Sequence, residues 1–192
     1  MQSNWRIGVF GLWHLGLVIA AVWSKLGFEV TAFDYSEETI KKLKKEEQPI
    51  FEPNLKETLR KSKNRGLILY SAKKNDLKNC DFIFLSYDTD LLENNESDLT
   101  ILKKAIEDIS SVIKKGALVI VSSQVPVGTC VDFRKIVQEK NRDVELVYSP
   151  ENLRLGDAVT CYLQPNRIVI GGENKTAITR ATSLFQNIKA DI

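Results

Sequence analysis

The part of the sequence that most constrains the fold lies close to the amino terminus. An apolar, β-rich run over residues 7–10 leads directly into Gly-Leu-Trp-His-Leu-Gly at positions 11–16, and an apolar helical segment follows. A glycine turn between a buried strand and a helix is typical of a βαβ unit that binds a dinucleotide. The first glycine makes the tight turn, and the last lets the helix pack closely on the strand. Trp13 stands where this fingerprint usually has its middle glycine.

A carboxylate completes the fingerprint. Asp34 directly follows the next β-rich run, residues 28–33, and stands 18 residues after Gly16. That spacing is close to the one expected for an acid that binds the ribose hydroxyls of NAD, and the same charge would repel the 2′-phosphate of NADP. The sequence therefore predicts an NAD site whose contacts are Gly11, Leu12, Trp13, His14, Leu15, Gly16 and Asp34.

Strand-like runs alternate with helical patterns along the rest of the chain. Residues 82–85 are uninterruptedly apolar, as expected of a parallel strand that is covered on both faces. The alternation predicts an α/β fold: a doubly wound, mostly parallel Rossmann-type sheet with helices on both faces, formed as one domain by residues 1–192. Further strands are expected at residues 67–70, 117–121, 144–148 and 167–170, and helices at residues 15–26, 54–59 and 129–140 and around Ile178, Ala181, Phe185 and Ile188.

Three further helix starts are expected at capping residues. Ser36 precedes a pair of glutamates, and Asn54 has Glu57 three residues later, as in a capping box. Ser97 precedes a segment with one apolar face, and we expect it to cap that helix. The apolar face consists of Leu102, Ile106, Ile109 and Ile113.

Composition excludes several classes of partner. Lys and Arg number 27 and Asp and Glu number 25, so the net charge of +2 gives no argument for nucleic acid or an anionic membrane as the main partner. The apolar run over residues 7–23 resembles a signal peptide or anchor, but two glycines at fingerprint spacing inside it favour the buried βαβ unit.

The cysteines are odd in number and lack C-x-x-C spacing, which favours a reduced, cytoplasmic compartment and no metal site; they are Cys80, Cys130 and Cys161.

Five ordered motifs resemble one known family. Together they are similar to the N-terminal NAD-binding domain of the UDP-glucose/GDP-mannose dehydrogenase family, over essentially the whole chain. The second and third of these motifs do not belong to Rossmann domains in general. The motifs are residues 11–16, residues 49–55 (Pro-Ile-Phe-Glu-Pro-Asn-Leu), residues 123–129 (Ser-Gln-Val-Pro-Val-Gly-Thr), residues 149–156 (Ser-Pro-Glu-Asn-Leu-Arg-Leu-Gly) and residues 165–171 (Pro-Asn-Arg-Ile-Val-Ile-Gly).

The resemblance implies an oxidation of the C6 alcohol of a nucleotide sugar, by default UDP-glucose, to the carboxylate. Two NAD+ are reduced in turn, and a cysteine holds the intermediate as a thioester. The family carries that cysteine on a later domain, beyond a helical dimerisation segment, and none of the cysteines here matches it. We therefore expect this chain to be the N-terminal part of a longer, homodimeric dehydrogenase and to be inactive alone. Its cysteines are expected to be small buried apolar residues, with Cys161 in a connecting segment.

The resemblance also assigns site residues beyond the glycine loop. It implies that Thr89 and Gln124 contact the cofactor, and that Glu151 borders the sugar and serves as a general base. The other interpretation of Glu151 is a loop or helix-start carboxylate. The remaining residues expected at the sugar are Asn152, Leu153 and Arg154.

Several positions depart from the family pattern. His14 stands where the family tends to have tyrosine, Gln124 where it usually has threonine and Leu155 where it often has glutamate. Asn152 replaces a phenylalanine and Asp90 a proline. Trp13, Gln124 and Leu155 together leave open an alternative, a degenerate nucleotide-binding or regulatory module without dehydrogenase activity.

Two other questions stay open at this stage. Another Rossmann oxidoreductase, such as a 3-hydroxyacid dehydrogenase, would share the opening fingerprint but would not account for residues 49–55 or 123–129. The choice among UDP-glucose, a UDP-N-acetylhexosamine and GDP-mannose is not readable from these residues.

Overall fold

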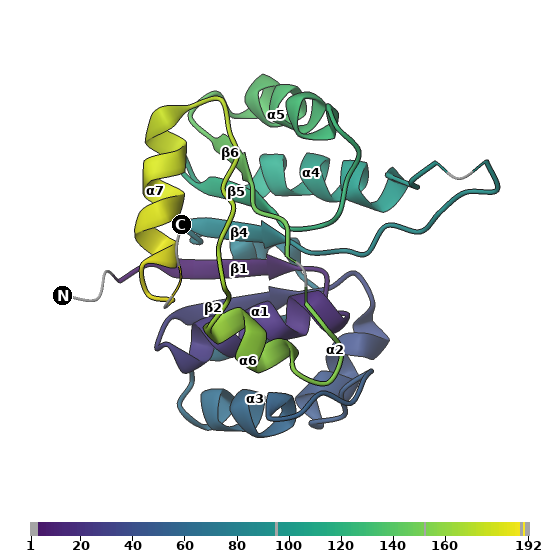
Figure 1. Ribbon diagram of the computed structural model, residues 1–192, viewed down its shortest axis with the longest axis vertical. Helices are drawn as coiled ribbons and strands as arrows, with labels where there is room; N and C mark the ends of the chain where they lie inside the picture. The colour runs from purple at the N-terminus through teal and green to yellow at the C-terminus, as the bar shows by residue number, and fades with distance from the viewer. Residues whose placement is uncertain (1–3, 95, 152, 189, 191–192) are drawn as a thin grey trace.

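The computed structural model describes residues 4–94, 96–151, 153–188 and 190, and its strands form a six-stranded parallel sheet (Figure 1). The strand order is β3-β2-β1-β4-β5-β6, so the order reverses between β1 and β4. In such sheets ligands bind outside the carboxyl ends of the strands at the reversal point. The strands are β1 (Arg6–Phe10), β2 (Glu29–Phe33), β3 (Ile68–Ser71), β4 (Phe82–Leu85), β5 (Leu118–Val121) and β6 (Glu145–Tyr148).

Helices cover both faces of the sheet. One core cluster lies between the sheet and α1, α2, α3, α6 and α7, and a second lies between the sheet and α4, α5 and the short helix η1. All four residues of β4 are buried because alternate side chains enter the two clusters. The helices are α1 (His14–Lys25), α2 (Glu37–Lys44), α3 (Leu55–Asn64), η1 (Lys74–Leu77), α4 (Thr100–Val112), α5 (Thr129–Lys140), α6 (Ala158–Leu163) and α7 (Lys175–Phe185). The predicted doubly wound α/β fold is confirmed.

The apolar run near the amino terminus forms β1 and α1 in the interior. Residues 16–24 of α1 are all buried, as expected of a helix that is apolar on every side. Indole–ring contacts of Trp23 with Phe28, Phe84 and Phe185 tie this helix to β4 and α7. In the described part of the chain, no helix has both the length and the apolarity needed to cross a membrane.

Local signals at the helix starts were correct for one helix and wrong for two. The Ser36 hydroxyl accepts the N–H of Thr39 at 3.1 Å and caps α2 as predicted. Asn54 instead adopts a left-handed conformation with φ of 64° and makes no capping hydrogen bond, although α3 does begin at the next residue. Ser97 lies too far from α4, and the Asp98 carboxylate accepts the first-turn N–H of Thr100 at 2.8 Å.

Two predictions for the last third of the chain are corrected. Residues 167–170 do not form a regular strand; Gly171 makes an isolated antiparallel bridge with Tyr148, with two hydrogen bonds of 2.8 Å. The segment runs against the direction of β6, so its alternating apolar pattern marks contact with the core at Ile168 rather than a strand of the parallel sheet. Cys161, expected in a connecting segment, lies on α6, which is too short for its helical period to be recognised in the sequence.

Candidate functional site

The glycine loop sits at the carboxyl end of β1, and its backbone requires both glycines. Gly11 has a φ of 101°, and its N–H donates to the carbonyl of Phe33 at 2.9 Å. A Cβ on Gly16 would lie 1.7 Å from the Gly11 carbonyl oxygen. The last glycine therefore lets α1 pack directly against the turn, which is the role that the fingerprint predicts.

Asp34 is held beside this loop by two backbone hydrogen bonds. Its Oδ2 accepts the N–H of Leu12 at 2.8 Å, and its Oδ1 accepts the N–H of Ser36 at 2.9 Å. The side chain is partly exposed at the end of β2. Because each carboxylate oxygen has a second lone pair, both remain able to accept a hydrogen bond from a ligand hydroxyl.

Trp13 precedes the first residue of α1. Its backbone is extended, with φ of −86° and ψ of −153°, and its side chain makes no capping hydrogen bond. The indole is 49% exposed. The loop therefore accommodates the missing glycine by keeping the large side chain partly in solvent at the amino end of the helix.

His14 faces a buried carboxylate that the sequence analysis did not select. Its Nε2 lies 3.0 Å from Oε2 of Glu52, and Glu52 is only 4% exposed. The same carboxylate accepts the backbone N–H groups of Gly156 at 3.0 Å and Ala158 at 2.9 Å. Burial opposes the charge of Glu52, but the hydrogen bonds from Gly156, Ala158 and His14 outweigh it and hold the pKa below its usual value.

The loops after β4 and β5 are joined by a predicted pair of cofactor residues. The Thr89 hydroxyl donates to the backbone carbonyl of Gln124 at 2.8 Å, while the Gln124 side chain is exposed. Asp88 lies in the same loop, and its partial burial raises the pKa of its carboxyl above the usual value, against the effect of nearby His14. The structure thus brings Thr89, Gln124 and the glycine loop to one edge of the sheet.

Glu151 follows β6 at the same edge. Burial raises the pKa of its carboxyl to about 8; burial, followed by the charge of Glu151, raises the pKa of Tyr162 on α6. Leu153 packs against the core and Arg154 is exposed. Asn152 lies outside the described residues. Leu155, at the position where the family often has glutamate, is 68% exposed.

Three buried serines at this edge were missed by the sequence analysis. Ser86, Ser122 and Ser149 directly follow β4, β5 and β6, and all are 0% exposed. The Ser86 hydroxyl donates to the carbonyls of Phe10 and Gly11, at 3.2 and 3.0 Å. The hydroxyls of Ser122 and Ser149 have no hydrogen-bond partner among the described residues. The signal was present in the sequence as a serine after each of three apolar runs.

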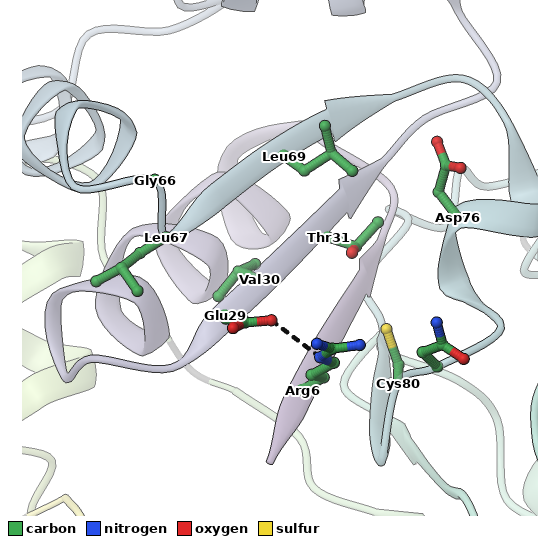
Figure 2. Close-up of a pocket in the computed structure, with 10 residues that line it drawn as sticks. Arg6, Glu29, Val30, Thr31, Gly66, Leu67, Leu69, Asp76 and Cys80 are labelled. Carbon is green, nitrogen blue, oxygen red and sulfur yellow. Dashed lines mark ion pairs between the residues drawn. The ribbon is translucent and has the colours of Figure 1, made fainter. Parts of the chain in front are cut away.

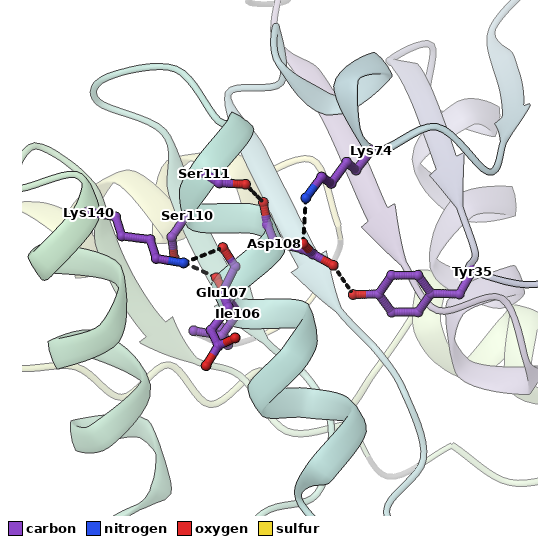
Figure 3. A network of polar contacts seen from close by, with 8 residues as sticks. All are labelled: Tyr35, Lys74, Ile106, Glu107, Asp108, Ser110, Ser111 and Lys140. Atoms are coloured by element: carbon purple, nitrogen blue, oxygen red, sulfur yellow. Dashed lines mark hydrogen bonds and ion pairs between the residues drawn. The ribbon is translucent and has the colours of Figure 1, made fainter.

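A second missed group flanks Asp34. The Tyr35 hydroxyl donates to Asp108 at 2.7 Å, and Lys74 contacts the other Asp108 oxygen at 2.5 Å (Figure 3). The Tyr35 ring stacks on Tyr87 with centroids 6.1 Å apart, and the Lys104 ammonium lies 4.4 Å from its centroid. Burial, followed by the hydrogen bond to Asp108, raises the pKa of Tyr35. These contacts fix the position of the residue that follows Asp34.

A cavity of about 270 Å³ lies away from these residues (Figure 2). It is bordered by the amino ends of β1 and β2, where Arg6 and Glu29 form an ion pair at 2.9 Å, and by Asp76 and Cys80. None of the predicted cofactor or sugar residues lines it. Because ligands of doubly wound sheets bind at the opposite, carboxyl edge, this cavity is not the candidate site.

The cysteines and metal-ligating groups give no alternative centre. Cys80 is buried, which raises the pKa of its thiol to about 12, and partial burial of Cys130 raises the pKa of that thiol to about 11. Cys161 is only partly buried, so the expectation of burial holds fully for Cys80 alone. Among the residues that the structure describes, no group of three or more His, Cys, Asp or Glu side chains could hold a metal ion.

The sheet order, the glycine turn and the acid after β2 define an NAD-binding domain of the dehydrogenase type. The model of the UDP-glucose/GDP-mannose dehydrogenase family, NAD binding domain, matches residues 5–189. This chain belongs to that family, and the predicted resemblance and cofactor class are confirmed.

Individual relatives agree with this assignment. UDP-glucose 6-dehydrogenase of Rickettsia typhi is 33% identical over 171 residues, covering 88% of this chain and 39% of the relative. The structure of UDP-D-ManNAc dehydrogenase from Pyrococcus horikoshii superimposes with a TM-score of 0.93 at 27% identity, covering 97% of this chain and 46% of that chain. A ternary complex of GDP-mannose dehydrogenase from Pseudomonas aeruginosa gives 0.91 at 25% identity, with coverage of 97% and 45%. The chain spans less than half the length of these relatives.

Proposed function

We propose that this chain is the NAD-binding part of a nucleotide-sugar 6-dehydrogenase, which oxidises the C6 alcohol of a UDP-sugar, by default UDP-glucose, to the carboxylate with two NAD+. The observation that carries the proposal is the single edge shared by the glycine loop, Asp34 and Glu151. The similarity to UDP-glucose 6-dehydrogenases supports the substrate class. The similarity to UDP-N-acetylmannosamine and GDP-mannose dehydrogenases keeps those nucleotide sugars as candidates.

The residues of the edge fit an NAD dinucleotide. The first turn of α1 has no acidic residue, and the helix is 12 residues long, so its free N–H groups favour an anionic pyrophosphate. Asp34 has acceptor capacity left for the ribose hydroxyls. In this proposal Thr89 and Gln124 contact the remaining part of the cofactor, and the cofactor supplies hydride acceptance when bound.

Glu151 is proposed as the general base at the sugar. A carboxyl with a pKa of about 8 gains and loses its proton near neutral pH, which suits proton transfer to and from the substrate or a water. Arg154, exposed in the same segment, would bind a polar part of the substrate, and Asn152 and Leu153 stay proposed sugar contacts.

The covalent step requires a thiol that this chain does not provide at the site. Cys80 lies beside the cavity of Figure 2, and raised pKa values keep the thiols of Cys80 and Cys130 protonated at neutral pH. We propose that the nucleophilic cysteine comes from a further domain of a longer, homodimeric protein. The relatives, which are more than twice as long as the matched region, support a longer protein.

The test is a calorimetric titration of the chain with NAD+ and NADP+, together with a turnover assay. We expect NAD+ to bind more tightly than NADP+, and Asp34→Ala to weaken NAD+ binding by about 1 to 3 kcal/mol through loss of charge-assisted hydrogen bonds. We expect no NADH production from UDP-glucose, UDP-N-acetylmannosamine or GDP-mannose by this chain alone.

Three outcomes would count against parts of the proposal. Equal or tighter binding of NADP+ would remove Asp34 from the ribose site. Turnover by the purified chain would show that the thiol is not needed from elsewhere. Absence of binding of either cofactor would favour the degenerate module.

A further inference from the structure

Glu52 joins three segments that lie far apart in the sequence. It belongs to the motif at residues 49–55, to which neither the cofactor nor the sugar assignments give a role. Its Oε2 contacts His14 of the glycine loop and accepts the N–H of Gly156, and its Oε1 accepts the N–H of Ala158. These are the side chain's contacts within the described residues, and all involve one buried carboxylate.

The hydrogen bonds favour the ionised form of Glu52, since they hold its pKa below the usual value although burial opposes the charge, and Nε2 of His14 is then the donor to the carboxylate. Both carboxylate oxygens act as acceptors, and the backbone N–H groups can only donate. A buried charge loses much of its compensation when any one donor is removed, because water does not replace it. The three donors are therefore held together by one charge rather than by three independent contacts.

Glu52 also holds one end of the loop that carries Glu151. At its first residue this segment is attached to the sheet, since the N–H of Ser149 donates to Val121 at 2.9 Å. Glu52 anchors its other end at the N–H groups of Gly156 and Ala158. Glu151 thus lies in a short loop with one end on the sheet and the other on a side chain that touches the glycine loop.

We propose that Glu52 is a positioning residue: through its contact with His14, it couples the conformation of the glycine loop to the conformation of the loop that carries Glu151. Binding of the dinucleotide at the glycine loop then stabilises the hydrogen bonds that hold Gly156 and Ala158, at the far end of the loop that carries the proposed base. The part that involves the dinucleotide rests on the proposed function. The positioning itself does not, because the contacts exist in the chain alone.

His14 separates this role from simple capping of α6. Among the described residues it hydrogen-bonds to Glu52 and not to residues 156–158, so the hydrogen bonds carry a change at His14 to Gly156 and Ala158 through the carboxylate. His14→Phe removes the donor. His14→Tyr is the matched control, because it keeps an aromatic ring and restores a hydroxyl donor.

The experiment is amide hydrogen exchange, resolved by NMR, on the whole 192-residue chain. Without ligand, we expect His14→Phe to accelerate exchange at Gly156 and Ala158 about fivefold, the scale of one net hydrogen bond. His14→Tyr should stay within about twofold of the original chain. The amides of β5 serve as the internal reference for global opening.

Unchanged exchange at Gly156 and Ala158 in the phenylalanine variant would overturn the proposal. Equal acceleration at those amides and throughout β5 would overturn it as well, because a general loss of stability would explain the effect. Glu52→Gln is a second variant, in which an NH2 group faces a backbone N–H. It should accelerate exchange at both amides more than His14→Phe, and a smaller effect would contradict the inference.

Adding saturating NAD+ tests the link to the cofactor. Because His14 belongs to the predicted NAD site, calorimetry first fixes the NAD+ concentration that saturates each variant. At saturation we expect the dinucleotide to slow exchange at Gly156 and Ala158 severalfold in the original chain and in His14→Tyr, but not in His14→Phe. Equal protection in all three forms would show that the coupling bypasses Glu52. Failure of the original chain to bind NAD+ would contradict the proposed function, while the ligand-free comparison would still decide the role of Glu52.

Discussion

The two sides of the carboxyl edge differ in how completely their polar groups are satisfied. On the side of the glycine loop, formed by the ends of β1, β2 and β4, the Asp34 carboxylate and the Ser86 hydroxyl both have hydrogen-bond partners within the chain. Beyond β5 and β6, the hydroxyls of Ser122 and Ser149 are buried without one among the described residues, and Glu151 is a carboxyl whose charge is disfavoured by burial.

This difference indicates which side is complete in itself. Buried polar groups normally find partners, so an unsatisfied group marks a place where water, a ligand or another part of the protein belongs. The glycine-loop side holds its geometry through contacts among the described residues. Beyond β5 and β6, two buried hydroxyls keep hydrogen-bonding capacity for a water or a ligand.

The largest expected effect tests the satisfied side. In Gly16→Ala the new Cβ would lie 1.7 Å from the Gly11 carbonyl oxygen and 2.8 Å from the Ser86 hydroxyl, so α1 must move. We expect the free energy of unfolding to fall by about 3 kcal/mol and NAD+ binding to be lost. Urea unfolding and calorimetry measure both.

Gly171→Ala is the control for that substitution. The atom nearest to its added Cβ is 4.0 Å away, and its φ lies outside the left-handed region. It should leave stability and binding nearly unchanged. Retention of NAD+ binding by Gly16→Ala would show that the glycine side is not tightly determined, and would remove the contrast between the two sides.

The next effect concerns Glu151 and pH. Its pKa is raised from 4.5 in the unfolded chain to about 8 in the folded chain, so the folded state holds the proton more tightly. The stability that this contributes is fully present below pH 4.5 and is lost as the pH rises through 8. Relative to Glu151→Gln, the original chain should lose on the order of 1 to 2 kcal/mol between pH 5 and pH 8, after allowance for solvent screening.

Urea unfolding at several pH values measures the Glu151 effect. Glu139→Gln, at an exposed position on α5, is the control for loss of a surface carboxylate. Parallel pH profiles for the original chain and Glu151→Gln would mean that Glu151 is as well solvated as the polar groups of the other side, which would break the comparison.

Trp13→Gly tests whether the indole hinders NAD+ binding on the side of the glycine loop. Restoring the usual glycine removes an indole that is half exposed at the start of α1 and contributes no capping hydrogen bond. We expect NAD+ binding to tighten by about 1 kcal/mol, because the dinucleotide can then lie against bare backbone. Calorimetry on both forms decides, with Trp13→Phe as the control that keeps an aromatic ring. Weaker binding by the glycine variant would identify the indole as a cofactor contact.

The smallest expected effect compares the two sides directly with equivalent serines. Ser86→Ala removes a hydroxyl with two acceptors and should cost about 1 kcal/mol of unfolding free energy. Ser149→Ala removes a hydroxyl with no described partner and should cost less than about 0.5 kcal/mol, or stabilise the chain. Denaturant unfolding of both variants is the measurement. Equal losses would show that the Ser149 hydroxyl is satisfied in solution.

Much of the fold was predictable because its signals are local. The apolar run at residues 82–85 is β4 at the predicted bounds, and α5 begins and ends at the predicted residues, Thr129 and Lys140. The errors lie where a local signal had a competitor. Asp98 replaced Ser97 at the start of α4, and residues 167–170 met β6 in the antiparallel direction, which no pattern of apolar residues reveals.

The candidate site was predictable only in part. The glycine loop and Asp34 were recognised because a strained turn and an acid at set spacing leave a trace in the sequence. Glu52 and Tyr35 were not recognised as site residues. Their importance comes from partners such as Asp108 that lie far away along the chain.

The sequence by itself determined the doubly wound parallel sheet, the glycine turn and the cofactor class, because steric limits on the backbone and the burial of apolar runs act between near neighbours. Only the tertiary structure decided that Glu52 joins two loops, that burial raises the pKa of Glu151 to about 8, and that Ser149 lacks a partner among the described residues. Burial and hydrogen bonding depend on which distant segments meet, and that is a property of the folded chain.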